Sequence, residues 1–269
     1  MKKRVTRRAL GPELSLQLRN YGQLMRVDKP IGIWLLLWPT LWALWLAGEG
    51  HPDPGLFIVF LVGVFVTRSA GCVLNDFADR KFDPYVERTR NRPLATGAVT
   101  TVEALTLFTS LGLIAIGLAS MLNRPTQMLA AIAAGLLIVY PFVKRIFSVP
   151  QFVLGAAFGW AVPMAFAAQT GTVPQVGWIA FGAALVWAII YDTFYAMVDR
   201  EDDKRIGVKS TALLFGDADL FVIAGLQVIM LTALVFMGLR ADLGGWYYAS
   251  VVVSAGLMAY HLWLARDRD

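Results

Sequence analysis

Eight long apolar stretches dominate this chain of 269 residues and leave it few possible folds. Each approaches the 20 or so residues that a helix needs to cross the hydrocarbon core of a bilayer. Hydrophobic residues make up 57% of the sequence and charged residues only 16%, against about 25% charged in soluble domains. The sequence therefore predicts an all-α, polytopic membrane protein. Its expected helices are residues 31–47, 56–75, 102–122, 126–143, 149–168, 178–198, 220–239 and 243–265.

Basic residues lie almost entirely on one side of these expected helices. If the N-terminus is cytoplasmic, 21 of the 24 Lys and Arg residues fall in cytoplasmic segments, and Arg68 lies within a helix. This asymmetry follows the positive-inside rule. We divide the chain into a basic cytoplasmic segment, residues 1–29, and a transmembrane domain, residues 30–269. We expect no nucleic-acid partner, because the basic residues flank apolar helices instead of forming a soluble patch.

The N-terminus has neither a cleavable signal pattern nor a long, acid-free presequence. We therefore expect a bacterial inner membrane, with the mitochondrial inner membrane as the alternative. The single cysteine, Cys72, lies in an apolar run and is interpreted as a small buried hydrophobic residue.

Two acidic clusters lie at the cytoplasmic ends of even-numbered helices, where carboxylates are costly and are usually functional. In the first, Asn75, Asp79 and Asp83 are four residues apart, so a continuing helix would place them on one face until Pro84 ends it. In the second, Asp192, Asp199 and Asp203 also share a helical face, together with Tyr195. Asp76, Glu201 and Asp202 fall off these faces and are interpreted as ion-paired surface charges.

Two rows of carboxylates brought together would repel one another unless a cation bound between them. Oxygen ligands favour Mg²⁺ or Mn²⁺ over zinc or copper. Mg²⁺ usually takes one or two carboxylates and completes its shell with phosphate and water. The clusters therefore predict a magnesium–diphosphate site whose metal ligands are Asn75, Asp79, Asp83, Asp199 and Asp203.

The two signatures, Asn75-Asp76-x-x-Asp79-x-x-x-Asp83 and Asp192-x-x-Tyr195-Ala196-x-x-Asp199-x-x-x-Asp203, resemble those of the UbiA-type intramembrane prenyltransferases. Segments 25–32, 37–45, 68–74, 88–94, 140–145 and 163–168 are similar to the branch that prenylates 4-hydroxybenzoate. The resemblance implies nine transmembrane helices around a central cavity open to lipid, whereas the sequence accounts for eight. It also implies Mg²⁺-dependent transfer from a polyprenyl diphosphate to 4-hydroxybenzoate, on the pathway to ubiquinone.

Several residues are expected to hold the two anionic substrates or to take part in the reaction. Arg145, with Lys144 beside it, occupies the position at which the resembled family uses a basic residue for substrate binding. Arg68 lies within a membrane helix and is expected to pair with a signature carboxylate. The remaining candidates are Arg88 and Arg92, in a loop that would cover the diphosphate, and Asp192 and Tyr195, which would position the phenol or accept the ring proton.

Three other functions fit the sequence less well. One is the same reaction with another aromatic acceptor, since the acceptor depends on the shape of the pocket. The others are a Mg²⁺ transporter and a non-catalytic lipid-binding membrane protein. A transporter should have ionisable residues near its midplane, whereas those of this chain cluster on one side. The sequence predicts no particular oligomeric state.

Overall fold

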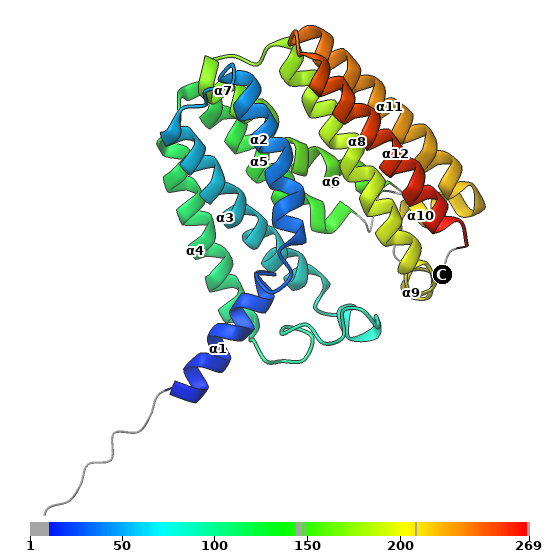
Figure 1. Cartoon of the computed structure of the whole chain (residues 1–269). Helices are drawn as coiled ribbons and strands as arrows, with labels where there is room; N and C mark the ends of the chain where they lie inside the picture. The colour runs from blue at the N-terminus through cyan, green and yellow to red at the C-terminus, as the bar shows by residue number, and fades with distance from the viewer. Residues whose placement is uncertain (1–10, 144–146, 148, 208, 268–269) are drawn as a thin grey trace, which may run out of the picture.

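The computed structural model describes residues 11–143, 147, 149–207 and 209–267, and every regular element within them is helical (Figure 1). The α-helices are α1 (Gly11–Leu24), α2 (Ile31–Ala47), α3 (Pro54–Asp79), α4 (Thr101–Ser120), α5 (Arg124–Val143), α6 (Pro150–Gly159), α7 (Ala161–Thr170), α8 (Gln175–Val198), α9 (Arg200–Ile206), α10 (Thr211–Phe215), α11 (Asp219–Arg240) and α12 (Gly245–Leu264). Short 3₁₀ turns at Asp83–Tyr85, Gly216–Ala218 and Ala265–Asp267 complete them.

Helices lie where the eight crossings were expected, with one change. Seven segments are long and apolar enough to cross a membrane, and α2, with 17 residues, is at the short end of the usual range. The crossing expected as one helix over 149–168 consists of α6 and α7, which are separated at Trp160. Pro163 contributes to the break, because it has no N–H to donate to the carbonyl of Gly159.

Helix α8 lies in the interior of the bundle, where it packs against α6 and α11, while α2 packs against α7 and α3 against α4. Small residues let these helices approach closely. Ala183 and Ala184 of α8 are buried in the main apolar core with Phe166 of α7. A side chain at Gly155 of α6 would place its Cβ only 2.6 Å from the carbonyl oxygen of Leu185, so the contact between α6 and α8 requires glycine. Cys72 is buried, as expected.

Helices α4 and α12 form the outside of the bundle. Only 11% of the apolar window of α4 and 6% of that of α12 are buried. Ile116 on α4 and Val252 on α12 are among the exposed apolar side chains. Such surfaces suit lipid, because hydrocarbon solvates apolar side chains as well as a protein core does.

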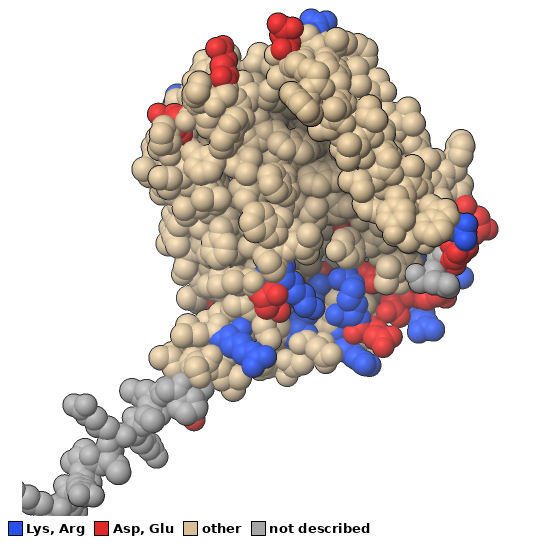
Figure 2. All heavy atoms as spheres, viewed as in Figure 1, with Lys and Arg blue, Asp and Glu red and all other residues tan. Residues whose placement is uncertain are grey.

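Charged side chains gather at one end of the bundle (Figure 2). This is the end at which α3 and α8 stop, and it carries the loop 80–100 and α9 (Figure 1). The expected helical rows are wrong in one respect. Helix α3 ends at Asp79, so Asp83 follows in a 3₁₀ turn that contains Pro84, and α8 ends at Val198, with Asp199 at a bend before α9.

Candidate active site

A cavity of about 1230 Å³ occupies the interior between α2 and α8. Its walls are largely apolar and include many small residues of α4 and α5, among them Gly112, Ala115, Ala130 and Ala134. Polar groups enter it mainly at the charged end of the bundle, from the loop after α1, from the end of α3, from loop 80–100 and from α8. The cavity is therefore a long apolar space with a charged mouth.

A smaller cavity of about 170 Å³ adjoins the charged mouth and collects the predicted polar residues of both clusters. Its lining includes Asn75, Asp79, Asp83, Asp192, Asp199 and Asp203. Asn75, Arg88, Arg92, Tyr140, Asp192 and Tyr195 line both cavities. The two acidic clusters, more than 100 residues apart in the chain, thus meet at the end of the apolar cavity, although the regular helices end before Asp83 and Asp199. We call this space the carboxylate cavity.

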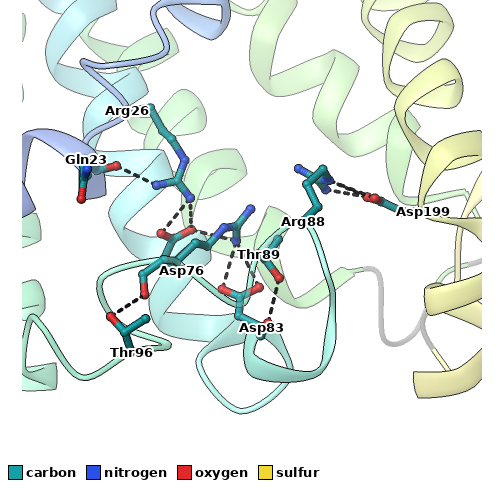
Figure 3. Close-up of polar contacts among 9 residues, drawn as sticks. Gln23, Arg26, Asp76, Asp83, Arg88, Thr89, Thr96 and Asp199 are labelled. Carbon is teal, nitrogen blue, oxygen red and sulfur yellow. Dashed lines mark hydrogen bonds and ion pairs between the residues drawn. The ribbon is translucent and has the colours of Figure 1, made fainter.

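Arg88 joins the two sides of the carboxylate cavity (Figure 3). Its Nε donates to Asp199 Oδ1 at 2.9 Å, and its Nη2 donates to Asp199 Oδ2 at 2.5 Å. The hydrogen bonds to Asp199 raise the pKa of Arg88 above its ordinary value. The backbone N–H of the preceding residue, Glu87, also donates to the Asp202 carboxylate at 3.4 Å. Loop 80–100 is therefore fastened to the junction of α8 and α9 by a charged pair.

Asp76 contacts two arginines and shares one of them, Arg92, with Asp83. Figure 3 shows Asp76 with Arg26, and Asp83 nearby. Arg26 Nη2 is 2.8 Å from both carboxylate oxygens of Asp76. Arg92 Nη1 is 3.0 Å from Asp76 Oδ1 and 3.0 Å from Asp83 Oδ2. Asp76 is an ion-paired residue, as expected, but it is buried and not on the surface. Burial raises the pKa of Asp83 above its ordinary value, against the opposing effect of Arg92.

Arg68 does not pair with a signature carboxylate within the described part of the chain, so that expectation is wrong. Its Nε is buried and has no hydrogen-bond partner there, and its guanidinium lies 5.2 Å from the ring centre of Phe158 on α6. The guanidinium also lies against Gly32 of α2. Seven residues of helix separate Arg68 from Asn75 by about 10 Å, so the guanidinium lies deeper in the large cavity than the carboxylates do.

Two tyrosines near Arg68 were not predicted from the sequence. Tyr140 and Tyr191 both line the large cavity, and the buried hydroxyl of Tyr191 has no partner within the described residues. The Tyr191 ring packs edge-to-face against Phe158 at 5.9 Å and against Trp187 at 6.0 Å. Sequence spacing favoured Tyr195, which also lines both cavities. The one available signal for Tyr191 was its position beside Asp192.

The remaining two predicted substrate-binding residues, Lys144 and Arg145, lie outside the described residues. Their roles remain predictions.

The lining of the carboxylate cavity fits a divalent cation that is shared with a phosphate ligand. Its acidic and amide donors are oxygens, which suits Mg²⁺. Among the described residues, no three His, Cys, Asp or Glu side chains are grouped so as to hold a metal by themselves. This is not a closed protein cage, and Mg²⁺ seldom uses one, because it retains water and binds through substrate phosphates.

Comparisons with known proteins agree with this geometry. A profile of the UbiA prenyltransferase family matches residues 36–269. A 4-hydroxybenzoate octaprenyltransferase of Nitrosococcus oceani is 58% identical over 249 residues, which cover 93% of this chain and 87% of the relative. The enzyme of the same name from Saccharophagus degradans is 50% identical over 266 residues, covering 98% and 89%.

Solved structures have the same fold. A UbiA homologue from Aeropyrum pernix without ligand superposes with a TM-score of 0.78 at 25% identity, covering 87% of this chain and 89% of that one. A UbiA homologue from Archaeoglobus fulgidus, solved with GPP and Mg²⁺, has a TM-score of 0.74 at 19% identity, covering 93% and 88%. With the family profile spanning most of the chain, this protein belongs to the UbiA prenyltransferase family of multi-pass membrane enzymes.

Proposed function

We propose that this protein transfers a polyprenyl group from a polyprenyl diphosphate to the ring carbon of 4-hydroxybenzoate ortho to the hydroxyl. The product would be 3-polyprenyl-4-hydroxybenzoate, a precursor of ubiquinone. One observation carries the proposal: a carboxylate cavity opens onto a long apolar cavity lined by an arginine, Arg68, whose buried Nε has no hydrogen-bond partner among the described residues. The names of the relatives in Nitrosococcus and Saccharophagus support the choice of acceptor.

The apolar cavity suits the prenyl tail of the donor. Its walls are largely apolar, and small residues of α4 and α5, such as Gly112 and Ala134, line it. A tail bound there would leave the diphosphate at the charged mouth, beside the carboxylate cavity. The Archaeoglobus fulgidus homologue solved with GPP and Mg²⁺ supports a prenyl diphosphate as the donor.

The carboxylate cavity would hold the diphosphate through Mg²⁺. The residues that would hold the metal are Asn75, Asp79, Asp83, Asp199 and Asp203. When bound, Mg²⁺ neutralises charge on the departing diphosphate. Arg88 and Arg92 line both cavities, so their guanidinium groups are in place to donate to diphosphate oxygens. These residues would make diphosphate a better leaving group, and the allylic C–O bond would break with its electron pair leaving on oxygen.

The acceptor would bind deeper, with its carboxylate on Arg68. The Arg68 guanidinium lines the cavity, and its Nε has no hydrogen-bond partner among the described residues, so it can bind a planar carboxylate through two parallel hydrogen bonds. Phe158 and Tyr191 would pack beside the benzoate ring, since both adjoin the guanidinium or line the cavity next to it. A π-electron pair of the ring would form the new C–C bond to the allylic carbon, and Asp192 would accept the ring proton, which restores aromaticity. Tyr195 would position the phenol.

Product formation in nanodiscs tests this function. The full chain is supplied with a polyprenyl diphosphate, labelled 4-hydroxybenzoate and Mg²⁺, and we expect a labelled prenylated product that EDTA abolishes and Mg²⁺ restores. Asp79→Asn should abolish turnover, while Asp242→Asn, in an exposed turn at the opposite end, should not change it. Prenylation of a naphthoate or homogentisate but not of 4-hydroxybenzoate would refute the acceptor. Mg²⁺ uptake by vesicles without product would indicate a transporter.

We further propose that the membrane is a bacterial inner membrane and that the charged end faces the cytoplasm. The bacterial relatives and the basic residues at that end support this. Glu49 lies in the exposed loop after α2, at the end opposite the charged cluster, and Tyr85 lies in the exposed loop after α3, so Glu49→Cys and Tyr85→Cys probe the two ends. In spheroplasts, a membrane-impermeant maleimide should label the first at once and the second only after permeabilisation. The reverse pattern would overturn the orientation.

A further inference from the structure

Asp76 lies between two predicted metal ligands in the sequence but does not line the carboxylate cavity. Asn75 and Asp79 line that cavity, whereas Asp76 lines only the larger one. The Asp76 side chain is 1% exposed and contacts two guanidinium groups that come from different parts of the chain. Arg26 comes from the turn after α1, and Arg92 comes from the loop before α4. Asp76 is therefore a buried carboxylate held by two arginines, and not one half of a surface ion pair.

Arg92 is the point at which Asp76 meets the predicted metal site. A single nitrogen, Arg92 Nη1, is 3.0 Å from Asp76 and 3.0 Å from Asp83. The two carboxylates therefore share one donor. Together the two arginines and the two aspartates have no net charge, and all four side chains are largely buried, so the charges are poorly screened.

The backbone holds the members of this network in place. Arg26 adopts a left-handed backbone conformation, with φ of 61°, which is unusual for a residue other than glycine. Its Nη1 donates to the carbonyl of Gln23 at 2.7 Å. Thr96 Oγ1 donates to the carbonyl of Arg92 at 3.2 Å, and Thr89 Oγ1 donates to the carbonyl of Asp83 at 3.0 Å. Arg26 and Arg92 are therefore positioned, and Asp76 is the carboxylate that both reach.

We propose that Asp76 is a positioning residue that draws part of the Arg92 charge away from Asp83 and so leaves Asp83 able to bind the divalent cation. This inference rests on the proposed metal role of Asp83. Without the Asp76 charge, Arg92 has Asp83 as its remaining carboxylate partner in the network, and the charge of Arg26 is no longer balanced. Both changes add positive potential beside the metal site, so the affinity for a divalent cation should fall by about tenfold.

Mn²⁺ binding to the full chain in nanodiscs, measured by electron paramagnetic resonance without substrate, tests this inference. Asp76→Asn should weaken Mn²⁺ binding about tenfold. Arg92→Gln should bind Mn²⁺ at least as tightly as the wild type, because it removes the competing guanidinium. The double variant Asp76→Asn/Arg92→Gln should recover an affinity within about threefold of the wild type. Asp242→Asn removes the same charge in an exposed turn at the opposite end of the bundle and should have no effect.

Recovery in the double variant separates this role from a purely structural one, because a second substitution in a damaged network would not repair it. A double variant that binds Mn²⁺ as weakly as Asp76→Asn would overturn the inference. If Asp76→Asn does not fold, Arg92→Gln alone decides, since weaker Mn²⁺ binding than in the wild type would refute the competition. Asp83→Asn separates the two proposals: if it leaves Mn²⁺ binding unchanged, the metal role of Asp83 fails and the inference fails with it.

Discussion

The substitution Gly32→Ala, which adds one methyl group on α2, should weaken acceptor binding by displacing the Arg68 guanidinium. An ideal Cβ at Gly32 would lie 2.5 Å from Nε and 2.8 Å from Cζ of Arg68, and nearer still to Nη2. These contacts are shorter than van der Waals separation by about 1 Å, so Gly32→Ala must displace the guanidinium. The displaced group is the end of a flexible side chain, and alanine is favoured over glycine within a helix by about 0.5–1 kcal/mol. The protein should therefore fold normally.

The expected loss follows from the hydrogen bonds that Arg68 would make. Charge-assisted hydrogen bonds contribute about 1.5–3 kcal/mol, which corresponds to a factor of about 10 to 150 in affinity. We expect Gly32→Ala to raise the KM for 4-hydroxybenzoate within this range. The KM for the prenyl diphosphate should rise less, because the carboxylate cavity, where the diphosphate would bind, does not include Gly32 or Arg68. Steady-state kinetics in nanodiscs, with each substrate varied in turn, measure both quantities.

Gly225→Ala is the matched control. Gly225 also lies within a helix, α11, and has open space where its Cβ would be. This variant should leave both KM values unchanged. An unchanged acceptor KM in Gly32→Ala, or an equal rise in both KM values, would refute the assignment of the benzoate carboxylate to Arg68.

Three further predictions concern the charged end. Arg88→Gln should tighten the binding of Mn²⁺ alone severalfold, because Asp199 loses the guanidinium that competes with the metal. The same variant should raise the KM for prenyl diphosphate, because it removes a donor to the diphosphate, and weaker Mn²⁺ binding would contradict the prediction. Arg200→Met should lower the free energy of unfolding by up to about 3–5 kcal/mol, since it removes the guanidinium that pairs with the buried Asp219 carboxylate at the start of α11. Arg205→Met, at an exposed pair, should lower it by less than about 1 kcal/mol, and thermal denaturation measures both. Burial raises the pKa of Asp83, so acidification should protonate it, and weaken Mn²⁺ binding, at a pH above the ordinary aspartate pKa of about 4. A Mn²⁺ affinity that does not change as the pH is lowered to about 4 would refute this prediction.

The crossings were predictable because length and hydropathy alone define them, but their interruptions were not. The break at Trp160 depends on how α6 and α7 pack as well as on Pro163, which a membrane helix can also accommodate. The six residues predicted from the two acidic clusters do line one cavity, although the reasoning assumed helices that continue to Asp83 and Asp203. A residue one turn beyond a helix end still lies on the same side of the bundle, so the predicted residues meet although the helices end earlier than expected.

The parts of the site that were missed are contacts between distant segments. Spacing within one helix indicates which side chains share a face, but not what lies opposite. Arg26 meets Asp76 across 50 residues of sequence, and nothing in either local pattern indicates this contact. Arg68 was expected to find a carboxylate, yet it lies between Gly32 and Phe158. That its Nε has no hydrogen-bond partner among the described residues depends on the arrangement of α2, α3 and α6, which only the folded protein shows.

The structure also changes the argument for a metal. The sequence predicted a cation because two rows of carboxylates should repel one another, yet three arginines already neutralise much of that charge: Arg26 and Arg92 at one cluster and Arg88 at the other. Repulsion alone therefore does not require a metal. What favours Mg²⁺ is the combination of oxygen donors around one small cavity with an adjoining space for an apolar tail. A site neutralised by arginines would remain folded before substrate arrives, and a magnesium–diphosphate complex would have to displace those arginines from Asp83 and Asp199. The same guanidinium groups would then be free to bind the diphosphate, so binding of the complex would exchange one set of charge pairs for another inside a site that stays compact.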